Sequence, residues 1–155
     1  MDAYKLVSKL IEKFELSVEI VVSDAFTTSS ICDEKVTEED IYNIMERIVR
    51  ELDENNYETG YEERWDTGRY SYYAVKVYSP DIENIENIVN KVITNYSKKI
   101  LDEEDCLDFV IEIRIPASLK RTVEDFIRRY GYDDIEDLQE TLHQNGSRIQ
   151  ISVDA

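Results

Sequence analysis

Two kinds of apolar repeat alternate along residues 17–115, and their order constrains the fold more than any other feature of the sequence. From Leu16 to Val22, apolar residues return at every second position, which is the period of a half-buried strand. From Ile41 to Leu52, they return at the spacing of an amphipathic helix. The whole chain of 155 residues suits one compact domain, and we expect these segments to share one core.

The same two periods return in the second half of this region. Residues 57–78 predict a hairpin, Ser79-Pro80-Asp81 predicts the start of a helix, and Phe109–Ile115 predicts a strand. The resulting order is β-α-β-β-α-β, which resembles the ferredoxin-like fold, with helices on one face of an antiparallel sheet. We therefore expect an α+β, ferredoxin-like core over about residues 16–116.

Further elements are expected on both sides of that core. Asp2 is placed to cap an N-terminal helix. After Pro116, a helical stripe ends at Gly131, which we expect in a left-handed conformation. A second helix follows Asp133-Asp134, and an alternating strand covers 149–153. The chain is thus predicted to end in a helical hairpin plus a strand, within a single domain over residues 1–155.

The charge of the chain is strongly one-sided, with 35 acidic against 18 basic residues and a net charge of −17. Such a field repels phosphate backbones, so it disfavours general nucleic-acid binding and favours a basic protein partner, or mimicry of nucleic acid at a basic groove. The solvated surface of a thermophile or halophile protein explains the charge equally well. Four acids near the last helix are candidate interaction residues: Asp133, Asp134, Glu136 and Asp137.

Tyrosines are concentrated on the predicted hairpin, and we expect Tyr70, Tyr72 and Tyr78 on the sheet face that the helices leave open. The stretch Arg69–Val75 resembles the base-stacking strand of the RNA-recognition motif, although Tyr70 replaces its glycine. A protein interface, or burial under the C-terminal elements, is favoured over base stacking. These three tyrosines are therefore candidate interaction residues.

Residues 109–144 carry a second resemblance. An alternating strand ending at Pro116, a helix, Gly131 and another helix resemble the ribbon-helix-helix family. The resemblance implies a homodimer that pairs through this strand, reads bases with strand side chains and holds a phosphate at the second helix. The implied DNA-reading candidates are listed in chain order: Glu112, Arg114, Lys120 and Arg121. The second helix opens with acids where the family has Ser and Arg.

No pattern in the sequence points to catalysis, so we expect no enzyme, no catalytic or metal-binding residues and no cofactor. The one histidine, His143, cannot build a zinc site alone. Cys32 and Cys106 could be free thiols or could form a disulfide, and the sequence allows both. Residues 24–36 form the best candidate for a functional loop. Neither a signal peptide nor a membrane span is expected, which favours a cytoplasmic location.

Two functions follow. The first is a non-enzymatic interaction or regulatory protein whose acidic surface binds a basic protein, in a nucleic-acid-handling complex or as a nucleic-acid mimic. The alternative is a dimeric ribbon-helix-helix type DNA-binding regulator.

Overall fold

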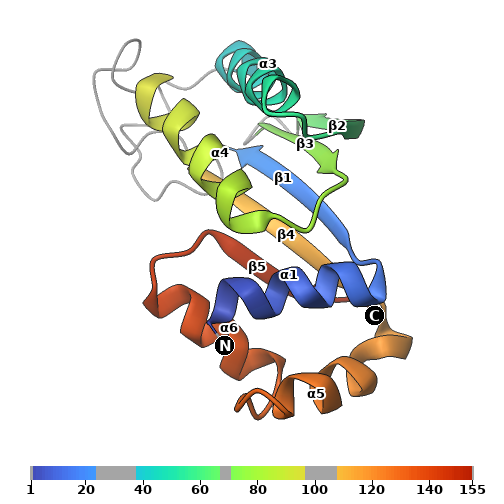
Figure 1. Cartoon of the computed structure of the whole chain (residues 1–155). Coiled ribbons are helices and arrows are strands. Elements are labelled where there is room, and N and C mark those ends of the chain that lie inside the picture. The colour runs from blue at the N-terminus through green and yellow to red at the C-terminus, as the bar shows by residue number, and fades with distance from the viewer. Residues whose placement is uncertain (1, 24–37, 67–70, 97–107, 155) are drawn as a thin grey trace.

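The computed structural model describes residues 2–23, 38–66, 71–96 and 108–154. These residues form five α-helices, one 3-10 turn and a five-stranded sheet (Figure 1). The helical elements are α1 (Ala3–Phe14), α3 (Glu38–Glu54), α4 (Ile82–Tyr96), η3 (Ala117–Leu119), α5 (Lys120–Arg128) and α6 (Ile135–Gln144). The strands are β1 (Ser17–Ser23), β2 (Thr59–Asp66), β3 (Ser71–Val77), β4 (Asp108–Ile115) and β5 (Ile149–Val153). The predicted α+β class is confirmed.

The strands lie in the order β2-β3-β1-β4-β5. Neighbours among β1 to β4 run antiparallel, whereas β5 runs parallel to β4. The expectation of an antiparallel sheet is therefore wrong for the last strand, and the sheet is mixed. The reason is the connection: η3, α5 and α6 carry the chain back along the sheet, so β5 starts at the same end as β4, as a parallel crossover requires.

Several predicted features lie outside the described residues. They are the loop at 24–36, the tip of the hairpin, Tyr70, Cys32 and Cys106. The arms of the hairpin are described as β2 and β3.

The helix ends follow local chemistry. The Asp2 carboxylate accepts a hydrogen bond from the Lys5 N–H at 2.9 Å, so the predicted cap of α1 is confirmed. Gly131 takes the predicted left-handed conformation after α5, with φ +93°. Glu15 ends α1 in the same region, with φ 51°. The sequence carries no glycine or asparagine there, so this helix end had no local signal.

One apolar core lies between the sheet and the helices. Val18, Ile20 and Val22 of β1 are buried, while the residues between them are less buried, as the alternation predicts. Ile127 of α5 and Leu138 of α6 belong to this same core cluster. The C-terminal helices therefore extend the helical layer, and the alternative in which they cover the second sheet face is wrong.

A buried carboxylate ties the two ends of the chain together. Glu86 of α4, 9% exposed, accepts hydrogen bonds from the Tyr4 hydroxyl at 3.1 Å and the Ser147 hydroxyl at 2.9 Å. The backbone N–H of Arg148 donates to the same carboxylate at 3.3 Å. Burial raises the pKa of Tyr4, so its hydroxyl stays a donor. This contact holds α1, α4 and the start of β5 in one arrangement.

The sheet edge at β5 is closed by a side chain. The amide of Gln139 on α6 donates to the Ile149 carbonyl at 2.8 Å and accepts from the Ile151 N–H at 2.6 Å. These are the backbone groups that a further strand would use, because β5 already pairs with β4 on its other side. The edge at β2 pairs with β3 alone among the described strands.

Candidate interaction surface

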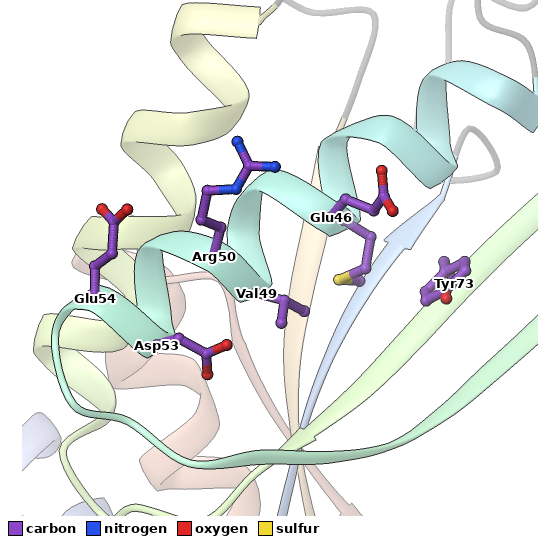
Figure 2. Close-up of a pocket in the computed structure, with 7 residues that line it drawn as sticks. Glu46, Val49, Arg50, Asp53, Glu54 and Tyr73 are labelled. Carbon is purple, nitrogen blue, oxygen red and sulfur yellow. The ribbon is translucent and has the colours of Figure 1, made fainter.

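A groove of about 490 Å³ runs along the exposed side of α3. Six of its lining residues come from α3 and one from β3: Met45, Glu46, Val49, Arg50, Asp53, Glu54 and Tyr73. Figure 2 shows Val49 on the side of α3 that faces Tyr73, whereas the Arg50 guanidinium points away from Tyr73. The floor of the groove is therefore apolar, and its charged groups lie along the helix.

The spacing of residues in α3 produces this arrangement. Ile41, Ile44, Ile48 and Leu52 are fully covered by the core. Val49 lies beside that stripe and is only partly buried, so it forms the border between core and solvent. Glu46, Asp53 and Glu54 follow on the outer side and are exposed. One helix thus supplies both the apolar floor and the acidic rim.

The acids at the end of α3 oppose the local electrostatics of the helix. The last turn contains Glu51, Asp53 and Glu54 and no basic residue. The C-terminus of a helix carries partial negative charge, so acids there are locally unfavourable. In the part of the chain that the structure describes, the Glu46, Asp53 and Glu54 carboxylates form no ion pair and accept no hydrogen bond. Among the described residues, these carboxylates therefore make no contact that stabilises the fold.

The turn after α3 fixes that end of the groove. Asn56 takes a left-handed conformation (φ 65°), and the Tyr57 N–H donates to the Leu52 carbonyl at 2.9 Å. The Tyr57 hydroxyl donates to Asp81 at 2.6 Å and accepts from the Asn84 amide at 2.6 Å. Burial, followed by the nearby Asp81 carboxylate, raises the pKa of Tyr57. The end of α3 is thus held against the start of α4.

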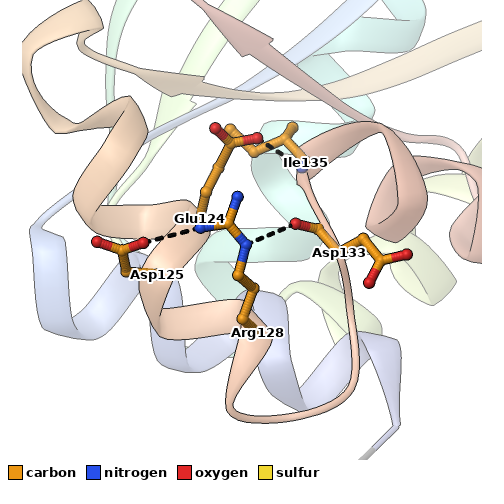
Figure 3. Close-up of polar contacts among 5 residues, drawn as sticks. All are labelled: Glu124, Asp125, Arg128, Asp133 and Ile135. Atoms are coloured by element: carbon orange, nitrogen blue, oxygen red, sulfur yellow. Dashed lines mark hydrogen bonds and ion pairs between the residues drawn. The ribbon is translucent and has the colours of Figure 1, made fainter.

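The predicted interaction acids at α6 behave differently (Figure 3). Asp134 caps α6 and accepts from the Asp137 N–H at 2.8 Å, while Asp137 accepts from the Asp133 N–H at 3.0 Å. Glu124 of α5 accepts from the Ile135 N–H at 3.2 Å. Two N–H groups in the first turn of α6, those of Ile135 and Asp137, are therefore already bound to carboxylates of this chain. Glu136 is exposed.

Arg128 braces the same turn from α5. Its Nε donates to the Asp133 carbonyl at 3.0 Å, and its Nη1 donates to Asp125 at 2.9 Å. The acidic turn is consequently a closed network of caps and one arginine, which Figure 3 shows around Arg128. A phosphate would have to displace these carboxylates to reach the helix N-terminus.

The DNA-reading candidates differ in the contacts that they make. Arg114, whose side chain is 47% exposed, pairs with Glu112 at 3.2 Å and Glu19 at 3.9 Å. These two carboxylates raise the pKa of Arg114. All three belong to the sheet face opposite the core. Lys120 and Arg121 are exposed at the start of α5 and form no ion pair among the described residues.

Of the three candidate tyrosines, the structure places one side chain. Tyr78 is 58% exposed. Its ring covers Gly60 of β2, where a Cβ would come within 2.6 Å of it. Tyr72 belongs to β3, and only its backbone is described. Tyr78 therefore shields a glycine of the hairpin while it stays accessible.

The groove residues Glu46, Val49, Asp53 and Glu54 were not predicted from the sequence. The sequence did show acids without a basic residue in the last turn of the predicted helix, which could have indicated a binding surface. An acidic chain contains many such clusters, so this signal is weak. Tyr73 joins the groove only through the packing of α3 on β3.

Comparisons with known proteins give no family for this chain: no family model, no curated protein and no solved structure matches it. Among the described residues, no three His, Cys, Asp or Glu side chains are grouped so that they could hold a metal ion. No described helix is long and apolar enough to cross a membrane. A proposal for the function of this protein therefore has to be based on the geometry of its surface.

Proposed function

We propose that this protein is a non-enzymatic interaction or regulatory protein that binds a basic segment of another protein in the groove along α3. One observation carries the proposal. Exposed acids that have no partner among the described residues border an apolar floor made by Met45, Val49 and Tyr73. Lys or Arg side chains of a partner supply the missing charge, and an apolar side chain beside them covers the floor.

The net charge supports the same conclusion at longer range. A chain with net charge −17 attracts a basic partner before contact and orients it toward the most acidic surface. Proteins that bind nucleic acids commonly expose basic segments, so we propose a nucleic-acid-handling complex as the setting. Occupation of such a segment by this acidic protein would also exclude nucleic acid from it, which is the mimic form of the same function.

We also propose that β1 to β4 with α3 and α4 are a ferredoxin-like unit. The order β2-β3-β1-β4 and the antiparallel pairs among these strands support this assignment. The C-terminal crossover and β5 are then an extension at the β4 edge. The fold itself implies no particular activity.

The alternative is a dimeric ribbon-helix-helix type DNA-binding regulator. The exposure of Arg114 favours it. Three contacts count against it: β4 already pairs with β1 and β5, Arg114 pairs with two acids, and the N–H groups that would hold a phosphate bind carboxylates. Mobility-shift assays at low salt test this alternative, and Arg114→Ala must abolish any shift if the strand reads bases.

The proposed function is tested with two variants of equal charge change. In the groove variant, Glu46, Asp53 and Glu54 are replaced by Lys. In the control variant, three exposed acids outside the groove are replaced by Lys: Glu12, Glu136 and Glu140. Each immobilised protein is exposed to the same extract, and retained proteins are eluted with salt.

We expect wild type and control to retain the same salt-eluted protein, and the groove variant to lose it. Equal loss from both variants would show that only net charge matters, and equal retention by all three would reject the groove. Circular dichroism and urea unfolding establish that both variants are folded.

A further inference from the structure

We infer that the basic segment binds as an added strand: it pairs in extended form with the outer edge of β2, which no described strand occupies, next to the groove along α3. This inference rests on the proposed function and specifies the mode of binding. Its occupant is a basic, extended segment of another protein, not a second copy of this chain.

The two edges of the sheet are built differently. At β5, the Gln139 side chain occupies the Ile149 carbonyl and the Ile151 N–H. At β2, pairing with β3 uses one side of the strand, and no other described strand pairs with it. A strand with a free edge presents a row of unpaired N–H and C=O groups, which is the template for strand addition.

The free part of β2 is long enough to pair. A bulge interrupts the register between Gly60 and Glu62, which disturbs the first part of the strand. From Glu62 to Asp66 the pairing with β3 is regular over five residues. A segment of this length is a typical strand and offers alternating outward N–H and C=O groups.

The register connects this edge to the groove. Phe109 pairs with Val22, Val22 with Tyr73, and Tyr73 with Arg64 of β2, so these positions form one row on the helical face of the sheet. An added strand continues that row by one position beyond Arg64. The groove lies on this face, because α3 packs on β2 and β3 and Tyr73 lines its floor.

Alternate side chains of the added strand therefore point toward α3, where Glu46, Asp53 and Glu54 lie. The backbone pairing and the acidic rim act on the same segment, because side chains on one face of a strand repeat at every second residue. Lys or Arg at alternate positions of the partner satisfies both requirements.

Charge decides between the two occupants that a free edge can take. Residues 59–66 contain three acids, Glu62, Glu63 and Asp66, against one base. Two copies pairing at β2 would bring these acids together across a junction between chains of net charge −17. Charged residues on an edge strand discourage such self-pairing, whereas a basic strand neutralises them.

The test uses defined peptides. The probe is a nine-residue peptide in which Lys alternates with Val, and a Glu-Val peptide of the same length is the control. Two further probes carry N-methyl groups at every second residue, in opposite phases. N-methylation removes the N–H donors on one side of a strand and leaves those on the other side intact.

We expect the Lys-Val probe to bind and to slow hydrogen exchange at alternate amides of 62–66, while the Glu-Val peptide does not bind. One N-methyl phase should weaken binding by about tenfold or more because it removes several backbone hydrogen bonds, and the other phase should change it by about threefold or less. The groove variant should weaken the binding of the unmodified Lys-Val probe, and Gln139→Ala should not.

The outcomes separate the two proposals. Binding that is lost in the groove variant but is equally insensitive to both N-methyl phases supports the groove and overturns strand addition. If the Lys-Val probe does not bind, strand addition at β2 is overturned, and so is binding of an alternating basic strand in the groove. Protection of β2 amides that rises with protein concentration, without peptide, identifies a second copy as the occupant and overturns the choice of partner.

Discussion

The acids at the start of α6 and those at the end of α3 differ in what they bind. Asp134 and Glu124 each accept a hydrogen bond from a backbone N–H in the first turn of α6, and Asp137 accepts one from the Asp133 N–H just before the helix. Asp53 and Glu54 have no such contact among the described residues, and they lie at the C-terminal end of their helix, α3. Acids at a helix N-terminus stabilise it and acids at a C-terminus oppose it. The first set is part of the fold, and the second set is the one to which we propose that a partner binds.

The expectation from the sequence concerned only the first set. Asp133, Asp134, Glu136 and Asp137 were predicted as interaction residues because they are a dense acidic run. Their density reflects the start of a helix, where carboxylates replace missing backbone acceptors. A dense run of acids is therefore weaker evidence for a binding surface than acids placed where the helix itself disfavours them. Four predictions sharpen or break this comparison.

The largest effect is expected at Glu86, the most buried acid among the residues whose side chains are described. Glu86→Ala removes the acceptor for Tyr4, Ser147 and the Arg148 N–H, so we expect the free energy of unfolding to fall by about 3 kcal/mol. Urea unfolding measures it. Glu83→Ala, at an exposed position of the same helix, should cost less than about 1 kcal/mol. Similar losses in both variants would contradict the structural role of Glu86.

The next effect concerns Asp40, an acid of α3 that does serve the fold. The Tyr96 hydroxyl donates to Asp40 at 3.0 Å, and burial, followed by this carboxylate, raises the pKa of Tyr96 to about 12. In the unfolded chain tyrosine ionises near pH 10, so the neutral form favours the folded state. The stabilisation is complete below pH 10 and is lost as the pH rises toward 12.

Two units of pKa correspond to about 2.7 kcal/mol of stability, of which about 2 kcal/mol is lost by pH 11.5. Urea unfolding at pH 8 and pH 11.5 should show this loss in wild type and a smaller loss in Tyr96→Phe. Because other tyrosines also ionise in this range, the difference between the two proteins is the quantity to measure. An identical pH dependence in both would exclude Tyr96 as the cause.

The capping acid Asp134 comes third. Asp134→Ala removes the acceptor for the Asp137 N–H, and we expect a loss of about 1 kcal/mol in the free energy of unfolding. Glu136 lies two residues after Asp134 and is exposed, so Glu136→Ala should change the free energy of unfolding by about 0.5 kcal/mol or less. Unchanged stability in Asp134→Ala would mean that this acid is as available as those of α3.

The smallest effect has the opposite sign. Asp53→Asn and Glu54→Gln remove charges that oppose the dipole of α3, so each should raise the free energy of unfolding by about 0.3–1 kcal/mol. Glu39→Gln, at the start of the same helix, should lower it. The double variant at 53 and 54 should also weaken the binding of a basic partner. Destabilisation by either groove substitution would show that these acids support the fold.

Much of the fold was predictable because it depends on local periods. The alternation in β1 and β4 and the apolar stripe of α3 place the core residues correctly. Asp2 and Gly131 act at helix ends as their chemistry predicts. Glu15 was missed because its left-handed conformation has no local signal. Asn56 was missed although asparagine is one of the residues that end helices in this conformation.

The candidate site was not predictable in the same way. Tyr73 reaches the groove through packing between α3 and β3, and Gln139 closes an edge that exists only because β5 pairs parallel to β4. Contacts between distant segments leave no period in the sequence. The free edge at β2 depends on the strand order in the same way.

The sequence by itself determined the α+β class, the extent of most helices and strands, and the acidic character of the surface. These properties follow from local periodicity and composition, which act residue by residue. Only the tertiary structure decided which acids are free, which sheet edge is closed and where an apolar floor meets an acidic rim. Those properties depend on which helix ends and strand edges come together, and packing of the whole chain sets that.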